Sequence, residues 1–169
     1  MTFRIEMEPY QGLDVMDPED TTTSEAIESV YRAGPAVRIH MGPRTWSRLP
    51  VSGGVSDILN DTIRMLKRIE IGGYPFDVSF LCNSFTAIWR FSESNGILTI
   101  KTLWTAAVGM SNGREVRDAQ FNDAVTQIVV DKEAFVAEWR KLLKQVKCDL
   151  LSAGYGGRLD DFEYLELLD

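Results

Sequence analysis

The sequence contains few of the residues that build metal centres and nucleophilic active sites. Among 169 residues there is one histidine, His40, and there are two cysteines, Cys82 and Cys148. A structural zinc site needs close pairs of Cys or His, and a site built on several imidazoles needs more than one histidine. Neither cysteine lies in a recognisable catalytic motif. We therefore expect no metal site, no cofactor and no catalytic residue.

Long apolar runs are also missing. No stretch approaches the roughly 18–20 apolar residues that cross a bilayer. Residues 1–10 alternate apolar and charged side chains, whereas a secretory signal has a basic start followed by an unbroken apolar stretch. In such a chain two cysteines are expected to be reduced and buried. The sequence predicts a cytoplasmic protein that does not bind a membrane.

Positive charge is scarce at both ends of the chain. The net charge is -7, and residues 1–30 hold one cation and eight carboxylates, whereas residues 149–169 hold one cation and six. Residues 31–148 carry the other 16 cations with 11 carboxylates. Nucleic-acid-binding domains are usually basic. An acidic chain with acidic ends therefore argues against a nucleic-acid partner.

The first part of the chain contains alternating and helical patterns. Apolar residues at every second position predict strands over residues 3–7 and 37–41. Between them, apolar residues at helical spacing predict a short helix that Thr23 or Ser24 caps and that Gly34-Pro35 terminates.

Two longer helices follow. Ser56 is a suitable N-cap for a helix that ends at Gly72-Gly73. Asp131 is a suitable N-cap for a second helix, which ends at Gly154. The β-branched residues over 124–130 predict a central strand just before that second helix.

The region from Pro75 to Ala107 has the character of strands. Asn95-Gly96 predicts a two-residue hairpin turn, because both positions favour positive φ. Counting outward from this turn gives the register, with Ser94 facing Ile97, Phe91 facing Ile100, Trp89 facing Thr102 and Ala87 facing Trp104. The same register places Arg90 opposite Lys101, which is unfavourable unless a carboxylate lies nearby. Residues 108–122 are polar and are expected to form a long turn or loop.

These patterns together predict one domain over residues 1–169. The fold class is α+β, with a mostly antiparallel sheet of about five or six strands and with two long helices and one short helix packed on it.

Two possible ligand or catalytic motifs have simpler structural explanations. Gly53-Gly54 precedes a helix, as in phosphate loops, but no Lys-Ser or Lys-Thr follows it. Asp57 and Asp61 lie one turn apart on a helix, where two carboxylates could serve a hydrolase. Arg64 is three residues beyond Asp61, so an exposed ion pair is the preferred interpretation.

The acidic ends and one tryptophan are the candidate partner-binding residues. Trp46 lies in a turn-like segment, residues 42–48, and is a possible interface anchor, whereas the other three tryptophans are expected in the core. The acidic ends either cover the basic helices or form a surface for a basic partner, where complementary charge speeds encounter. The candidate carboxylates are Asp14, Asp17, Glu19, Asp20, Asp160, Asp161, Glu163 and Glu166.

Two segments resemble a known class of proteins. Residues 128–155, IVVDKEAFVAEWRKLLKQVKCDLLSAGY, and the tail DDFEYLELLD resemble the bacterial immunity proteins of polymorphic and contact-dependent growth inhibition toxin systems. The resemblance implies a protein that binds a cognate toxin domain and blocks it without catalysis of its own. Many of those toxins are basic nucleases, so the resemblance implies a basic partner.

Two other functions remain open from the sequence. The first is a small enzyme that uses carboxylates with Arg or Tyr in a pocket. The second is a regulatory or scaffold subunit of an oligomer, with Trp46 buried in the interface. The chain is expected to be a monomer or a homodimer.

Overall fold

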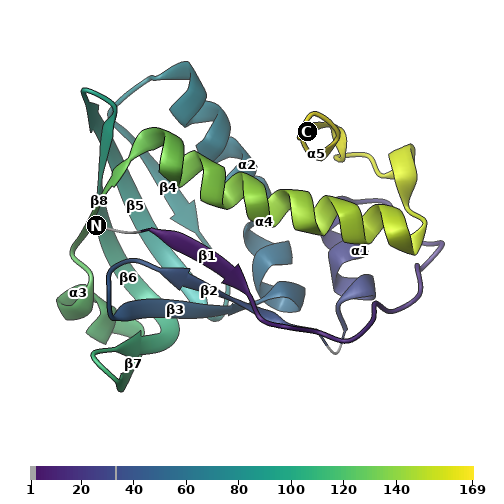
Figure 1. The fold of residues 1–169 in the computed structure, drawn as a ribbon, viewed down its shortest axis with the longest axis horizontal. Coiled ribbons are helices and arrows are strands. Elements are labelled where there is room, and N and C mark those ends of the chain that lie inside the picture. The colour runs from purple at the N-terminus through teal and green to yellow at the C-terminus, as the bar shows by residue number, and fades with distance from the viewer. Residues whose placement is uncertain (1–2, 33) are drawn as a thin grey trace.

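The computed structural model describes residues 3–32 and 34–169 and has the predicted α+β class (Figure 1). Its sheet is antiparallel, with eight strands in the described residues rather than five or six. The strands are β1 (Arg4–Met7), β2 (Ala36–His40), β3 (Thr45–Pro50), β4 (Phe76–Phe80), β5 (Phe85–Ser94), β6 (Ile97–Ser111), β7 (Arg114–Arg117) and β8 (Gln127–Asp131). The helices are α1 (Thr23–Val30), α2 (Ser56–Ile71), α3 (Phe121–Ala124), α4 (Lys132–Ala153) and α5 (Glu163–Glu166).

Strand β6 connects the two parts of the sheet. Its first part pairs with β5 and β8, and its last residues pair with β3 and β7. The main strand order is β1-β2-β3-β6-β5-β4. A single 15-residue strand therefore holds the N-terminal strands against the central hairpin.

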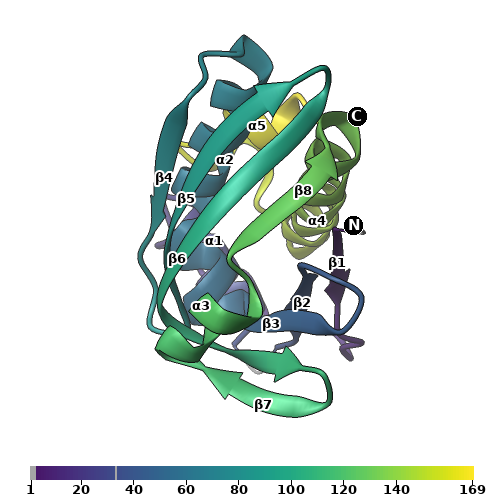
Figure 2. The ribbon, with the colours of Figure 1, turned by 90° about the vertical axis from the view of Figure 1, so that its left-hand side faces the viewer.

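The helices α1, α2 and α4 lie on one side of the sheet. Figure 2 looks onto the opposite face of β4, β5, β6 and β8, and no long helix covers it. Along each strand, successive side chains point alternately to this face and to the core, as is common for antiparallel sheets. In β5 the odd-numbered residues from Phe85 to Phe91 are buried, and Ile88 and Arg90 between them are exposed.

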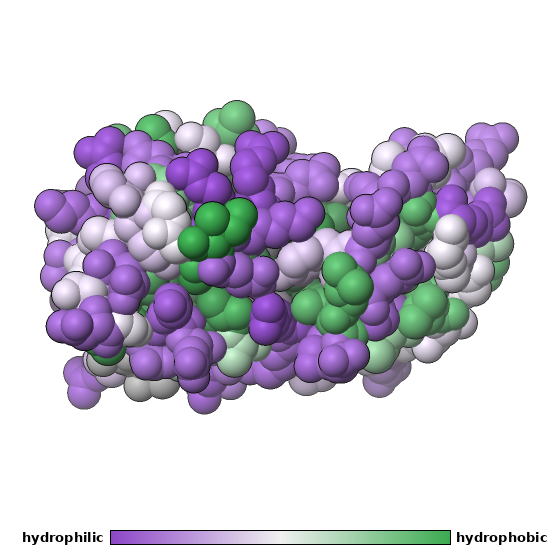
Figure 3. Space-filling view, turned by 90° about the horizontal axis from the view of Figure 1, so that it is seen from above, coloured by the Kyte–Doolittle hydropathy of each residue, from purple (hydrophilic) through white to green (hydrophobic). Residues whose placement is uncertain are grey.

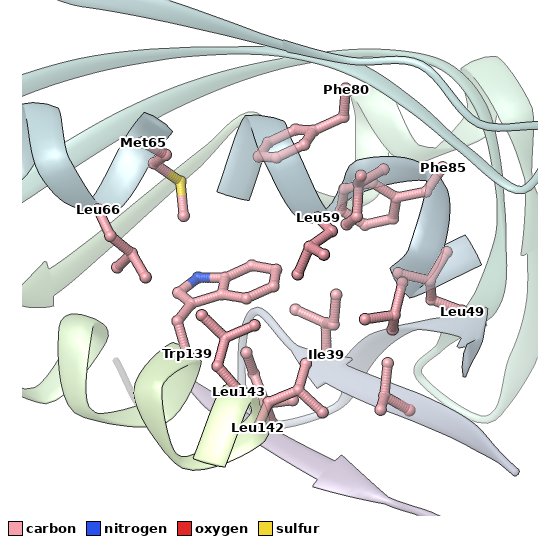
Figure 4. Close-up of a cluster of buried hydrophobic side chains, with 14 of the residues drawn as sticks. Ile39, Leu49, Leu59, Met65, Leu66, Phe80, Phe85, Trp139, Leu142 and Leu143 are labelled. Carbon is pink, nitrogen blue, oxygen red and sulfur yellow. The ribbon is translucent and has the colours of Figure 1, made fainter. Parts of the chain in front are cut away.

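The core is one continuous cluster of buried side chains. Figure 4 shows Trp139 of α4 pointing between Leu59 and Leu66 of α2, with Ile39 of β2 nearby. Trp89, Trp104 and Trp139 are at most 2% exposed. The prediction that three of the four tryptophans belong to the core is confirmed.

The predicted hairpin register is also confirmed. Phe91 pairs with Ile100, Trp89 with Thr102 and Ala87 with Trp104. Arg90 lies opposite Lys101, and Asp77 of β4 receives two hydrogen bonds of 2.8 Å from the Arg90 guanidinium. The carboxylate that this like-charge pair requires is therefore present on the next strand.

The helix ends agree with the predictions except at two N-termini and at the C-terminus of α1, which ends at Val30 with Tyr31 as its C-cap and not at Gly34-Pro35. Gly72 and Gly154 end α2 and α4 with positive φ, and Asp131 caps α4. Helix α1 is capped by Thr22 in a capping box with Glu25, one residue before the first predicted cap.

Ser56 does not cap α2. Val55 precedes the helix with helical dihedrals, because the turn over Val51–Val55, in which Ser52 and Gly53 are not helical, leads directly into it. Ser56 is the first helical residue, and its hydroxyl bonds to the carboxylate of Glu28 instead.

The predictions for residues 42–48 and 108–122 are wrong in part. Strand β3 begins at Thr45, and its inward side chains include the polar residues Thr45 and Ser47. Because of these two residues, the sequence lacks the apolar–polar alternation that predicts a strand. In the second region β6 continues to Ser111, and Asn112-Gly113 turns the chain into β7.

Strand β8 and one cysteine also differ from expectation. In the described residues β8 pairs with β6 alone, so it is not a central strand. Cys82 and Cys148 are both free, as predicted, but only Cys82 is buried. Cys148 is exposed because it lies on the outward side of α4, whose buried residues at this point are Val146, Asp149 and Leu150.

Candidate protein-binding surface

The two acidic ends of the chain lie together at the end of the molecule where α1 and the last turn of α4 are found (Figure 1). The Asp160 amide donates to the Thr21 carbonyl over 2.8 Å. The Arg158 guanidinium donates to the Pro18 carbonyl over 2.8 Å. We call the surface formed by residues 14–20 and 160–169 the acidic end.

A buried tyrosine joins the two segments of the acidic end. The Tyr155 hydroxyl donates to the carboxylate of Asp20 and accepts a hydrogen bond of 3.0 Å from the Asp17 amide. Burial of Tyr155, together with the Asp20 carboxylate, raises the pKa of this phenol. Asp20 is therefore a structural acceptor as well as a surface charge.

Asp161 has a similar structural role at the N-terminus of α1. Its carboxylate accepts hydrogen bonds of 2.6 Å from both the amide and the hydroxyl of Thr23. A carboxylate at this position satisfies free helix amides and suits the helix dipole. Asp20 and Asp161 thus hold the two segments together.

The other predicted carboxylates face solvent. Asp17 lies 4.0 Å from the Arg32 guanidinium. Within residues 3–32 and 34–169, no Lys or Arg nitrogen lies within 4.0 Å of the remaining five exposed carboxylates. These five are Asp14, Glu19, Asp160, Glu163 and Glu166.

The C-terminal segment packs on the protein with the buried side chains of Phe162, Leu165 and Leu168, and it contacts the cations of the basic helices through its backbone and one aromatic ring. Lys147 of α4 donates to the carbonyls of Glu166 and Leu168 at 3.1 and 2.5 Å. The Lys67 ammonium lies 5.7 Å from the centre of the Tyr164 ring. The tail therefore covers cations of α2 and α4, as one of the two expectations for the ends has it, and Asp160, Glu163 and Glu166 are exposed.

Trp46 lies on a different part of the surface. It pairs with His40 of β2 and with Met110 of β6. The Arg38 guanidinium lies 4.9 Å from the centre of the Trp46 ring. Arg38 is in turn held by Glu8, which also binds Arg48. Trp46 is half-buried in a strand, and none of these contacts belongs to the acidic end.

The glycine turn before α2 already holds a carboxylate. Glu28 of α1 accepts hydrogen bonds from the hydroxyls of Ser52 and Ser56 and from the Gly53 amide. Burial by itself would raise the pKa of Glu28, but these hydrogen bonds outweigh burial and lower it. The position that a phosphate would take in an anion-binding turn is thus filled by a side chain of the protein.

The main feature that sequence reasoning missed is a buried carboxylate with no Lys or Arg nitrogen within 4.0 Å among residues 3–32 and 34–169. Asp149 of α4 accepts hydrogen bonds from the hydroxyls of Tyr10 and Tyr31 and one of 3.1 Å from Gln145. Burial, then the hydrogen bond to Asp149, raises the pKa of Tyr31 far above its ordinary value. The available signal was an acidic residue within the apolar stripe of α4.

Asp57 and Asp61 lie on the first half of α2, where Arg64 approaches Asp61 to 3.4 Å. The predicted ion pair is confirmed.

In the described part of the chain, no group of three or more His, Cys, Asp or Glu side chains is placed to hold a metal ion. No helix there is long and apolar enough to cross a membrane.

Comparisons with protein-family models, with curated proteins and with solved structures found no match. The acidic end combines segments that are well over 100 residues apart in the chain, with Tyr155 and Asp161 reaching residues 20 and 23.

Proposed function

We propose that this protein is a binding protein, without catalysis of its own, that neutralises a basic protein partner through the acidic end. The partner is of the kind found in bacterial toxin–immunity pairs, and the complex forms in the cytoplasm. The observation that supports this proposal is the convergence of the two acidic segments. It brings residues 17–21 against residues 155–160, and Asp14, Glu19, Asp160, Glu163 and Glu166 are exposed on the two segments.

Charge gives the acidic end a long-range attraction for a basic partner, and Val15 and Leu167 are exposed there for apolar contact. Exposed carboxylates attract a basic partner over distances of about the Debye length, roughly 10 Å at 0.1 M salt. Complementary charge of this kind raises association rates and disfavours wrong partners. Segments whose backbone is already held in place lose less entropy on binding. Here Tyr155 binds Asp17 and Asp20, and Asp161 binds Thr23.

The test is a binding measurement with the protein encoded by the neighbouring gene. We expect a complex at about 0.05 M NaCl that weakens strongly at about 0.5 M NaCl. Asp14→Asn, Asp160→Asn and Glu163→Gln in one variant should weaken the complex at least about tenfold, mainly through a slower association rate. The absence of a complex at low salt would contradict the proposal.

A matched control changes the net charge of the protein by the same amount. Asp57→Asn, Asp123→Asn and Glu133→Gln remove the same number and types of carboxylate from exposed positions on α2, α3 and α4. If this control weakens the complex as much as the first variant does, the protein binds through its net charge and not through the acidic end.

A further inference from the structure

A groove of about 870 Å³ runs along the outward side of α4 beside the last turn of α2. Its apolar lining comes from Ile69, Val136 and Ala137. Its charged lining comprises four cations and two carboxylates, although the whole protein carries a net charge of -7. The groove is thus a basic region on an acidic protein.

In the part of the chain that the structure describes, two of its cations have no carboxylate partner. Arg140 is paired with Glu70 and Lys141 with Glu138. Lys132 and Lys144 have no carboxylate oxygen within 4.0 Å among residues 3–32 and 34–169.

One end of the groove already meets an acidic and apolar segment, the chain's own C-terminus. A second hollow is lined by Glu70, Arg140 and Lys144 of the groove together with Tyr164, Leu167, Leu168 and Asp169. In this segment Leu165 and Leu168 are buried. Lys147 of α4 binds the carbonyl of Leu168. The α2–α4 surface therefore accommodates leucines and a tyrosine between acidic residues.

We propose that the open part of this groove binds an acidic, leucine-containing helical segment of a partner protein. Its apolar residues would contact Val136 and Ala137, and its carboxylates would lie beside Lys132 and Lys144. Helices commonly bind grooves in this way, with apolar anchors on one face. This site is opposite in charge to the acidic end, so the inference does not depend on the proposed function.

The distribution of hydrophobic residues on the surface agrees with a contact to a single segment of a partner. Figure 3, which looks down on the molecule, shows a largely hydrophilic surface with separate hydrophobic patches. A broad apolar interface would need a larger continuous patch. A single amphipathic segment needs only a few apolar contacts with charges on both sides.

The probe is a labelled peptide with the sequence DDFEYLELLD, which is that of residues 160–169. We expect saturable binding to the full-length protein by fluorescence anisotropy. A second peptide, with Asn and Gln replacing Asp and Glu, should bind at least about tenfold more weakly. Failure of the acidic peptide to bind saturably would overturn the proposal.

The variant that tests the location is Ala137→Glu with Lys144→Glu, both at exposed positions of α4. It should weaken binding of the acidic peptide at least about tenfold, because it replaces attraction by repulsion. The control is Ala119→Glu with Lys101→Glu, which changes the net charge equally at exposed positions elsewhere and should leave binding within about twofold. Equal weakening by both variants would overturn the proposal.

Cys148 provides a second measurement, because it lines the groove and is the exposed cysteine. The bound peptide should slow alkylation of Cys148 several-fold in the folded protein. Binding without protection of Cys148 would place the peptide outside the groove and would overturn the proposal. Neither variant alters a carboxylate of the acidic end, so this result and that for the proposed function can be separated.

Discussion

The hydroxyl of Tyr155 donates a hydrogen bond to the carboxylate of Asp20, 135 residues earlier in the chain. Tyr155 is 1% exposed, so this bond is formed away from water at the base of the acidic end. The same oxygen accepts from the Asp17 amide. A single phenol thus links the C-terminal segment to the acidic loop.

Tyr155→Phe should lower the free energy of unfolding by about 1–3 kcal/mol, because it removes a hydrogen bond to a charged group. Chemical denaturation would measure this loss, and limited proteolysis should cut the loop around Asp17 faster. Tyr74→Phe is the control. The Tyr74 hydroxyl makes only a 3.4 Å contact with the Ile69 carbonyl, so its loss should change the stability by less than about 0.5 kcal/mol.

Tyr31 and Asp149 should be strongly coupled. Tyr31→Phe removes a buried hydrogen bond to a carboxylate and should cost about 1.5–3 kcal/mol. A double-mutant cycle with Asp149→Asn should give a coupling energy of about 1–2 kcal/mol. Additive effects in urea denaturation would show that the hydrogen bond contributes little to stability.

The tyrosines predict the behaviour of the protein at high pH. All five have a raised pKa, with burial as the largest cause in each. A raised folded-state pKa adds stability that is present below the unfolded value, about 10, and that is lost as the pH rises above it. We expect little phenolate absorbance near 295 nm until the protein unfolds, and then a cooperative increase. A gradual titration of the five phenols near their ordinary pKa in the folded protein would contradict this prediction.

Gly109 should tolerate no side chain. A Cβ atom at this position would lie 2.0 Å from the Trp46 carbonyl oxygen and 2.8 Å from the Ser47 Cα atom. Because both are backbone atoms of the paired strand, Gly109→Ala should destabilise the protein by at least about 3 kcal/mol. Gly73→Ala is the matched control, since a Cβ there meets nothing within 4 Å. Thermal unfolding of both variants would compare the two sites, and equal melting temperatures would show that β3 and β6 can separate at no cost.

Local patterns in the sequence determined the central hairpin and the long helices. Asn95-Gly96 sets the register by itself, because a two-residue turn leaves a single way of counting outward. Asp131 and Gly154 mark the ends of α4, because capping depends on neighbouring residues. The second hairpin, at Asn112-Gly113, carried the same turn signal, but the polar residues around it concealed the strands.

Only the tertiary structure decided which contacts the charged segments make. The sequence shows two acidic ends, but their union depends on contacts such as Tyr155 with Asp20 and Asp161 with Thr23. Likewise Glu28 is 25 residues from Gly53, and nothing local indicates that its carboxylate fills the glycine turn. Turns and caps are encoded within a few residues, whereas these contacts form only after the sheet and helices have packed and brought distant parts of the chain together.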